Sequence, residues 1–366
     1  MSPPGPSRKP AHVESDPDPD ETGVQTDEQV WFSDGNIVVV AANKVAFRVH
    51  KGILSLRSEV FRDMFSPAIT DAHAATAESE SESVEGCPVV HLTDPPEDIR
   101  RLFLVLCCGK NYYYDRDELV PVPFAVLASL IRTAHKYAVQ DVLDDALARL
   151  KKYYTNDLAA WQDPSSRARH VTTVPRDAPT VLHLARLTNT PSLLPTAFLV
   201  CTMIATWRDY QPDGSCVSPI AALSVLDLTG VIVGKGLLVQ ARATRALHLL
   251  GAAPSAHCLA RETCAAARDG PVAALRGSSR VFKSSMGDAH ALTPMVDIFW
   301  PRYSRWPKFC GSCHEALVEE DGMVIRLLWK HLPLLFGLRL DEGCWPSSGS
   351  LTWTSRDSRE RQEAGK

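Results

Sequence analysis

The chain has 366 residues, a hydrophobic fraction of 45% and a formal net charge of −4. This length is enough for two domains with sizeable cores, and the mild charge, with basic residues scattered, predicts no attraction to nucleic acid or to an anionic membrane. The N-terminus lacks an apolar leader, and the longest apolar stretch is too short to span a bilayer. We therefore expect a soluble intracellular protein of the cytoplasm or nucleus, with its ten cysteines reduced.

Three segments have a composition that does not support a packed core. Residues 1–27 are rich in Pro, Asp and Ser, and residues 354–366 are mostly charged, so we expect a disordered tail at each end. Residues 66–86 include the run AESESESVEG between two well-patterned regions. This run predicts an acidic loop inserted into a domain.

The first patterned region predicts a hairpin followed by two short helices. Ile37–Val40 is a β-branched run, Asn43 and Lys44 favour a turn, and Val45, Phe47 and Val49 alternate as in a strand. Residues 52–57 predict a helical turn carrying Ile53, Leu54 and Leu56. Ser58 is placed to cap the next helix, in which Phe61, Met64 and Phe65 share one face.

After the acidic loop the pattern predicts one strand and three helices. Residues 89–92 form the strand, and Asp94-Pro95-Pro96-Glu97 predicts a helix start with a capping Asp94. A second helix opens after Pro123, and a third carries acidic residues early and Lys151 and Lys152 late, which suits the helix dipole. The residues expected in the core of these helices are Ile99, Leu102, Phe103, Leu106, Phe124, Leu127, Leu130, Ile131, Ala134, Val142, Leu143, Ala146, Leu147 and Leu150.

Three stretches of this region, in this order, resemble the BTB/POZ domain. They are FRVHKGILSLRSEVFRDMF, VVHLTDPPEDIRRLFLVLCCG followed by three tyrosines, and LIRTAHKYAVQDVLDDAL. The resemblance implies an α+β fold over residues 28–155, a small sheet packed under a cluster of helices. It also implies a role in self-association or adaptor binding, with the acidic insertion falling at a loop.

The resemblance places a dimer surface on the first strand and the early helices, around Trp31, Phe32 and Ile53. Trp31 and Phe32 are adjacent aromatics at a strand, so we expect one of them to face outward and mark an interface. Asp34 and His50 are also expected to be residues of this interface. They could form an acid–base pair, but buried, hydrogen-bonded structural roles are favoured over catalysis.

Residues 170–345 predict a second, mainly helical region with helices over residues 181–194, 195–207, 219–228 and 235–250. Its end, LLWKHLPLLFGL (residues 327–338), is similar to the C-terminal segment of BTB proteins that are numerous in mushroom-forming fungi. In those proteins a cysteine pair often lies a short distance upstream, as Cys310 and Cys313 do here.

Cysteine spacing suggests one possible metal site. Cys310 and Cys313 have the C-x-x-C spacing that lets two thiolates share a tetrahedral zinc ion. The best candidates for the other two ligands are Cys258 and Cys264, with His257 and His314 in reserve. The interval from Cys258 to Cys264 is wider than in the usual metal knuckle, which favours the alternative of ordinary thiols in a half-buried loop and no cofactor.

No motif for an enzyme is present. Gly230 to Lys235 has the glycines and lysine of a phosphate loop but not its spacing, and Gly236 stands where Ser or Thr is needed.

The leading hypothesis is therefore a non-enzymatic interaction module that pairs with itself or with another BTB protein. A cullin-type ubiquitin ligase adaptor and a transcriptional regulator are the alternatives. The first is weakened because KNYYYDRDEL (residues 110–119) lacks the hydrophobic-x-Glu pattern of some cullin-binding members, and the second because no DNA-binding module is seen.

Overall fold

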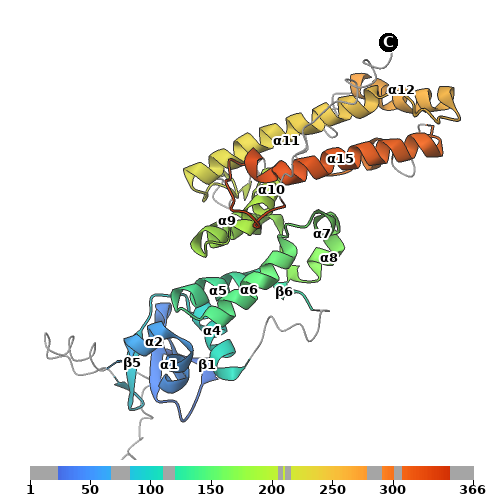
Figure 1. Cartoon of the computed structure of the whole chain (residues 1–366). Helices are drawn as coiled ribbons and strands as arrows, with labels where there is room; N and C mark the ends of the chain where they lie inside the picture. The colour runs from blue at the N-terminus through green and yellow to red at the C-terminus, as the bar shows by residue number, and fades with distance from the viewer. Residues whose placement is uncertain are drawn as a thin grey trace, which may run out of the picture. The chain divides into compact units, whose positions relative to one another are not determined.

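The computed structural model describes residues 24–66, 83–109, 120–204, 209–210, 216–277, 291–300 and 307–346. These residues fall into two compact units, one within residues 1–111 and 136–139 and the other within residues 112–135 and 140–366 (Figure 1). Most of the predicted N-terminal tail, most of the acidic loop and the whole C-terminal tail lie outside the described residues.

The first unit is built on a mixed five-stranded sheet with the order β1-β3-β2-β5-β4. β2 and β3 pair antiparallel, as the predicted hairpin requires, and Asn43 and Lys44 in the connection both have a positive φ. β1 pairs parallel with β3, and β5 pairs parallel with β2. The strands are β1 (Gln25–Trp31), β2 (Ile37–Val40), β3 (Val45–Val49), β4 (Ser83–Val84) and β5 (Cys87–His91).

β1 begins inside the predicted N-terminal tail because Asp27 is held there. The Asp27 carboxylate is buried, accepts the backbone N–H groups of Gln29 and Val30, and lies 2.6 Å from Arg100 Nε. β4 likewise falls inside the predicted acidic loop, and Glu85, in the turn after it, pairs with Arg48 at 2.6 Å. Both segments are therefore fixed by ion pairs with residues that are distant in sequence.

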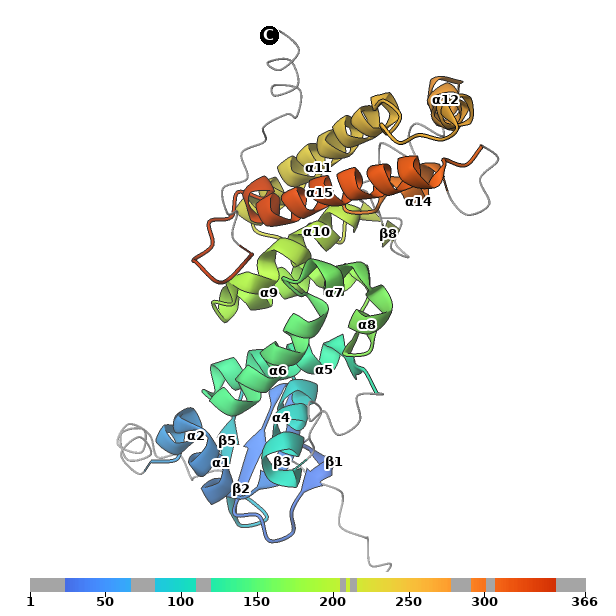
Figure 2. The same cartoon turned by 45° about the vertical axis from the view of Figure 1, so that its right-hand side comes forward.

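Three helices complete the first unit: α1 (Lys51–Arg57), α2 (Glu59–Met64) and α4 (Pro96–Cys108). α4 packs on β1 and β3 (Figure 2). The predicted cap of α2 is confirmed, because Ser58 Oγ accepts the N–H of Phe61 at 3.0 Å. Ser58 Oγ also donates to the Tyr137 carbonyl at 2.6 Å, so one hydroxyl joins α2 to residues 136–139.

The start of α4 differs from the prediction. The helix begins at Pro96, and no side chain caps it. The Asp94 carboxylate instead accepts the Tyr137 hydroxyl at 2.5 Å and lies 2.6 Å from Lys136 Nζ. The prediction of a capping Asp94 is therefore wrong, because these two donors hold the carboxylate. The helix ends at Cys108, where Gly109 adopts the left-handed conformation with φ of 64°.

The second unit contains the next helices, and they include two that the sequence places in the first domain. α5 (Phe124–Lys136) and α6 (Gln140–Tyr153) bury every core residue predicted for them. The limits of the predicted domain, 28–155, stay a prediction. The other elements before residue 220 are β6 (Val122–Pro123), α7 (Leu158–Gln162), α8 (Pro164–Ala168), β7 (Val171–Thr172), α9 (Ala178–Leu187), α10 (Leu194–Ile204), β8 (Asp209–Tyr210) and β9 (Cys216–Val217).

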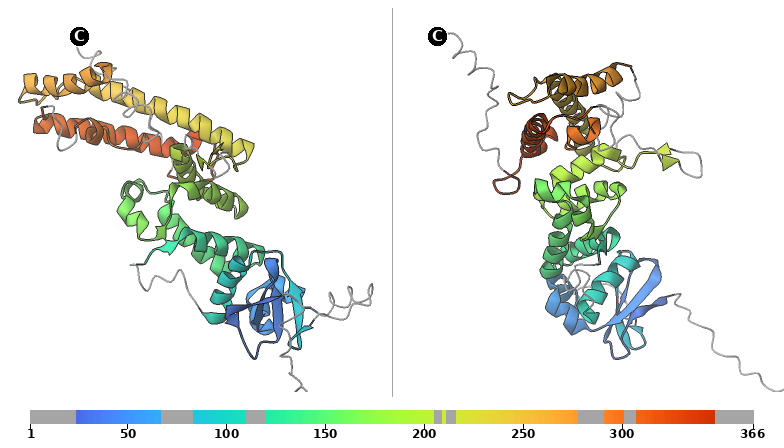
Figure 3. Two further views of the ribbon diagram at one scale, coloured as in Figure 1. Left: turned by 180° about the vertical axis from the view of Figure 1, so that it is seen from behind. Right: turned by 90° about the vertical axis from the view of Figure 1, so that its right-hand side faces the viewer.

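Two long antiparallel helices, α11 (Val225–Gly251) and α15 (Gly311–Leu335), form the rest of the second unit and lie side by side in every view (Figure 3). α12 (Arg261–Gly277) and α14 (Met295–Phe299) pack beside them. The predicted break between residues 228 and 235 is wrong, because α11 continues through Gly230, Gly234 and Gly236. Among the described helices, none is both long and apolar enough to cross a membrane.

The glycines of α11 make room for a ring from the end of α15. Phe336 stacks on Phe198 with ring centroids 5.1 Å apart, and a Cβ added at Gly234 would lie 2.2 Å from the Phe336 ring. The glycines that resemble a phosphate loop therefore serve helix packing.

Gly234→Ala is expected to destabilise the second unit by about 1–3 kcal/mol, because the buried ring cannot move without disturbing its neighbours. Gly236→Ala is the matched control. Its Cβ would meet nothing within 4 Å, so it should gain up to about 1 kcal/mol from helix propensity. Urea unfolding of both variants measures the difference, and equal effects of the two changes would contradict the packing.

Candidate functional site

The residues predicted for a dimer surface lie around the start of α1. Trp31 packs against the sheet cluster of Val38, Val40, Ala46 and Cys87, and the Phe32 ring lies 5.2 Å from the His50 ring. Both aromatic side chains are half-buried. Each ring has a partner from outside its own strand, so neither of them is fully exposed.

Asp34 and His50 are adjacent, as the sequence suggested, but are not both buried. His50 Nε2 lies 3.4 Å from Asp34 Oδ1, and the Asp34 side chain is 82% exposed. The expectation of a buried Asp34 is wrong, because the residue lies in the exposed turn between β1 and β2. A contact this long and open to water contributes little to stability, so the pair is best described as part of the surface.

The apolar part of this surface is formed by α1. Ile53 is 37% exposed and Leu56 is 85% exposed, and three positions along a helix place them on one side. Leu54, between them, is fully buried. Leu56 was not predicted as a surface residue, although helical periodicity places it on another side of α1 than Leu54. We call Ile53 and Leu56 the α1 pair.

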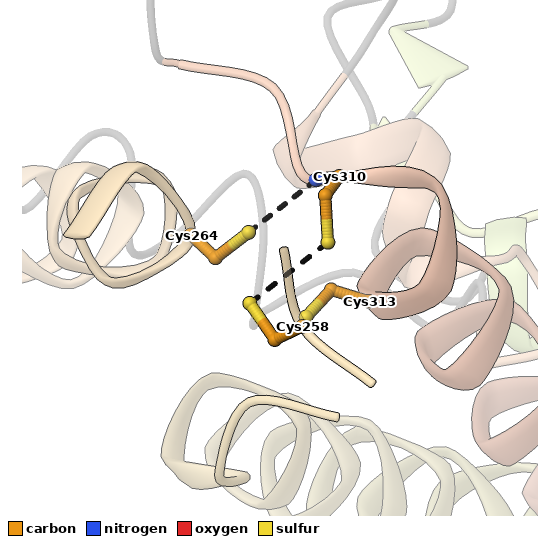
Figure 4. A group of neighbouring side chains, drawn as sticks. All are labelled: Cys258, Cys264, Cys310 and Cys313. Atoms are coloured by element: carbon orange, nitrogen blue, oxygen red, sulfur yellow. Dashed lines mark hydrogen bonds between the residues drawn. The ribbon is translucent and has the colours of Figure 1, made fainter. Parts of the chain in front are cut away.

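The four cysteines proposed as metal ligands come together in the second unit. Cys258 lies in the connection from α11, Cys264 in the first turn of α12, and Cys310 and Cys313 at the start of α15. Their four sulfur atoms all lie within 4.8 Å of one another (Figure 4). The reserve histidines, His257 and His314, are exposed and do not belong to this group.

The chain between Cys258 and Cys264 explains how a wide interval still brings two thiols together. The N–H of Cys264 bonds the Ala260 carbonyl at 2.9 Å, so α12 starts between the two cysteines. Its first turn brings Cys264 back toward Cys258. The first turn of α12 thus has the role that a short knuckle has in the usual metal site.

The surroundings shift the pKa values of the individual thiols in different directions. Backbone N–H groups of Cys313 and Leu259 point at the Cys310 sulfur and lower the pKa of Cys310 to about 6. Burial raises the pKa of Cys313 to about 12 and also raises the pKa of Cys264. The surroundings therefore favour the thiolate form more at Cys310 than at Cys264 or Cys313.

Comparison with known proteins identifies part of the first unit. The model of the BTB/POZ domain matches residues 28–91. These residues carry a BTB/POZ domain. The match spans β2 to β5 and includes both the α1 pair and Phe32, Asp34 and His50.

The BTB domain is a protein–protein interaction module, and its family is non-enzymatic. An α+β fold, with the BTB sheet near the N-terminus and a mainly helical region after it, is therefore confirmed. No curated protein matches the chain.

Proposed function

We propose that the chain is a self-associating interaction protein whose BTB domain pairs with a second copy through the α1 pair and the surface around Phe32. The observation that carries this proposal is the exposure of Ile53 and Leu56 on one side of α1, inside the residues that match the BTB domain. Contact of the leucine and isoleucine side chains with water is unfavourable, so their burial against a partner lowers the free energy.

A symmetric pair suits this surface. Cyclic dimers are the commonest closed assemblies, and their interface uses the same patch on both copies. The surroundings of the α1 pair are amphipathic: the Lys51 ammonium lies 5.9 Å from the centre of the Phe65 ring, and Asp34 lies beside His50. An apolar centre with a polar rim is the usual composition of an interface core and its edge.

A cullin adaptor and a transcriptional regulator are narrower proposals that remain alternatives. Residues 110–119, in which the sequence analysis sought a cullin-contacting pattern, lie outside the described residues. The similarity to the expanded BTB family of mushroom-forming fungi also stays a proposal, based on residues 327–338 and on the cysteine pair. Affinity purification from the native cell separates these alternatives, because recovery of a cullin supports the adaptor.

Leu56→Asp is expected to convert a dimer of the full chain into a folded monomer, because a charge at the centre of the interface meets its own copy across the two-fold axis. Leu226→Asp is the matched control. Leu226 is 84% exposed against 85% for Leu56, but it lies in α11 outside the BTB domain. Light scattering at micromolar concentration measures the mass, and circular dichroism checks the fold. A Leu56→Asp protein that keeps the mass of the unmodified dimer would contradict the proposed surface.

A further inference from the structure

The spacing of the four sulfur atoms fits a single tetrahedral ion better than a disulfide. Cys310 Sγ lies 3.9 Å from Cys258 Sγ, whereas a disulfide needs about 2.05 Å. Zinc–sulfur bonds of about 2.3 Å place the sulfurs of a tetrahedral site about 3.8 Å apart. We propose that Cys258, Cys264, Cys310 and Cys313 bind one structural zinc ion that joins the start of α12 to the start of α15.

Backbone N–H groups donate hydrogen bonds to two of the four sulfurs. The N–H of Cys310 donates to Cys264 Sγ at 3.3 Å, and the N–H of Ser255 donates to Cys313 Sγ at 3.4 Å. Hydrogen bonds of this kind favour metal-bound thiolates over neutral thiols, since they stabilise negative charge on sulfur.

Burial and ligand type narrow the choice of ion. Cys264 and Cys313 are 0% and 1% exposed, and Cys258 and Cys310 are half-buried. Thiolates are soft ligands that select zinc over magnesium or calcium. Four protein ligands leave no open position for a substrate, so the proposed ion has a structural role.

A buried arginine lies one helical turn after Cys264, and its guanidinium donates to the Ala253 carbonyl at 3.0 Å. Arg268 lies four residues after Cys264 on α12, and its guanidinium lies 5.6 Å from the centre of the Phe309 ring, which precedes Cys310. Its Nε is buried without a hydrogen-bond partner among the described residues. A zinc ion with four thiolates carries net negative charge, and a nearby guanidinium reduces the cost of burying that charge.

The proposed ion would link the connection after α11 and the start of α12 to the start of α15. The connection after α11 and the start of α12 lie on one side of the cluster, and the first turn of α15 lies on the other (Figure 4). The apolar cluster that includes Leu250, Phe299 and Leu317 packs these same helices together. The four ligands are brought together only in the folded chain. The free energy of zinc binding therefore adds to the stability of the folded state.

Elemental analysis of the full chain, purified with a reducing agent and without chelator, tests the proposal. We expect about one zinc per chain and a loss of that zinc in Cys310→Ser. Cys344→Ser is the matched control, because Cys344 is also half-buried in the second unit but lies outside the cluster. Metal-free protein that takes up no added zinc would overturn the proposal, as would iron in place of zinc.

Two measurements keep the test decisive if Cys310→Ser does not fold. In the unmodified chain, a thiol reagent under native conditions should leave the four cluster thiols unreacted until a chelator is added. In denaturant with chelator all ten cysteines should react, and two fewer would show a disulfide and overturn the zinc site. Exchange of the ion for Co²⁺ should give the thiolate-to-cobalt charge-transfer band of a tetrahedral site, and the weak spectrum of octahedral cobalt would also overturn it.

Discussion

Arg245→Met is expected to destabilise the second unit by about 3–5 kcal/mol. Arg245 Nε lies 2.9 Å from Asp321 Oδ1, and the two side chains are 1% and 2% exposed. Burial lowers the pKa of Arg245 and raises the pKa of Asp321, and in each case the partner's charge acts in the opposite direction. Removal of the arginine leaves the carboxylate buried without its counter-charge.

Arg245 also donates to the carbonyls of Ala291 and Thr293, and Asp321 accepts the N–H of Met295 at 2.6 Å. The ion pair therefore joins α11 and α15 to the segment that leads into α14. Loss of Arg245 disturbs all three segments. We therefore expect a large decrease in the free energy of unfolding.

Two further variants separate the buried ion pair from other losses. In Arg245→Met with Asp321→Asn the isolated charge is gone and the acceptor for Met295 is kept, so the double variant should be more stable than Arg245→Met alone. His248→Ala removes an exposed contact between the same helices, His248 Nε2 to Glu320 Oε1 at 2.6 Å, and should cost no more than about 1 kcal/mol. Urea unfolding measures all three. A double variant that is less stable than Arg245→Met would contradict the account.

Phe61→Ala is expected to destabilise the BTB domain by about 3–5 kcal/mol. Phe61 is fully buried, and its ring stacks on Tyr137 with centroids 4.5 Å apart and an interplanar angle of 5°. The Phe103 ring lies 6.0 Å away. Removal of the ring leaves a cavity between α2, α4 and residues 136–139, and it also loses the aromatic contacts.

Arg62→Ala, at the next position on α2, is the control. The Arg62 side chain is 58% exposed, so its loss should change stability by no more than about 0.5 kcal/mol. Hydrogen exchange of peptides from residues 37–64, followed over a urea series, reports on this domain separately from the second unit. Equal loss of protection from hydrogen exchange in the two variants would show that the buried and exposed faces of α2 are wrongly assigned.

Several elements of the first unit could be predicted because their signals are local. Alternation in β3, the serine before α2 and the apolar stripe of α4 each depend on residues within a few positions of one another. Asp94 was misassigned because its partners, Lys136 and Tyr137, are distant in sequence and compete with the helix end for one carboxylate. The continuity of α11 was missed for a similar reason, since glycines that weaken an isolated helix here admit the Phe336 ring.

In the candidate sites too, local sequence signals could be predicted and contacts between distant residues could not. The four cysteines could be named from spacing, but their convergence depends on where α12 begins and on the packing of α15 against α11. The α1 pair was within reach of the sequence, because residues 53 and 56 lie on one side of a helix and residue 54 on another. Trp31 and Phe32 were treated as neighbours in one strand, and their partners come from the sheet and from His50.

Sedimentation equilibrium of the unmodified full chain tests the central claim, self-association of the BTB domain, most directly. A dilution series from high to low micromolar concentration should give twice the chain mass of 40.2 kDa at the upper end and dissociate in a single step to the chain mass on dilution. One chain mass at every concentration would contradict self-association and would leave the α1 pair to a different partner.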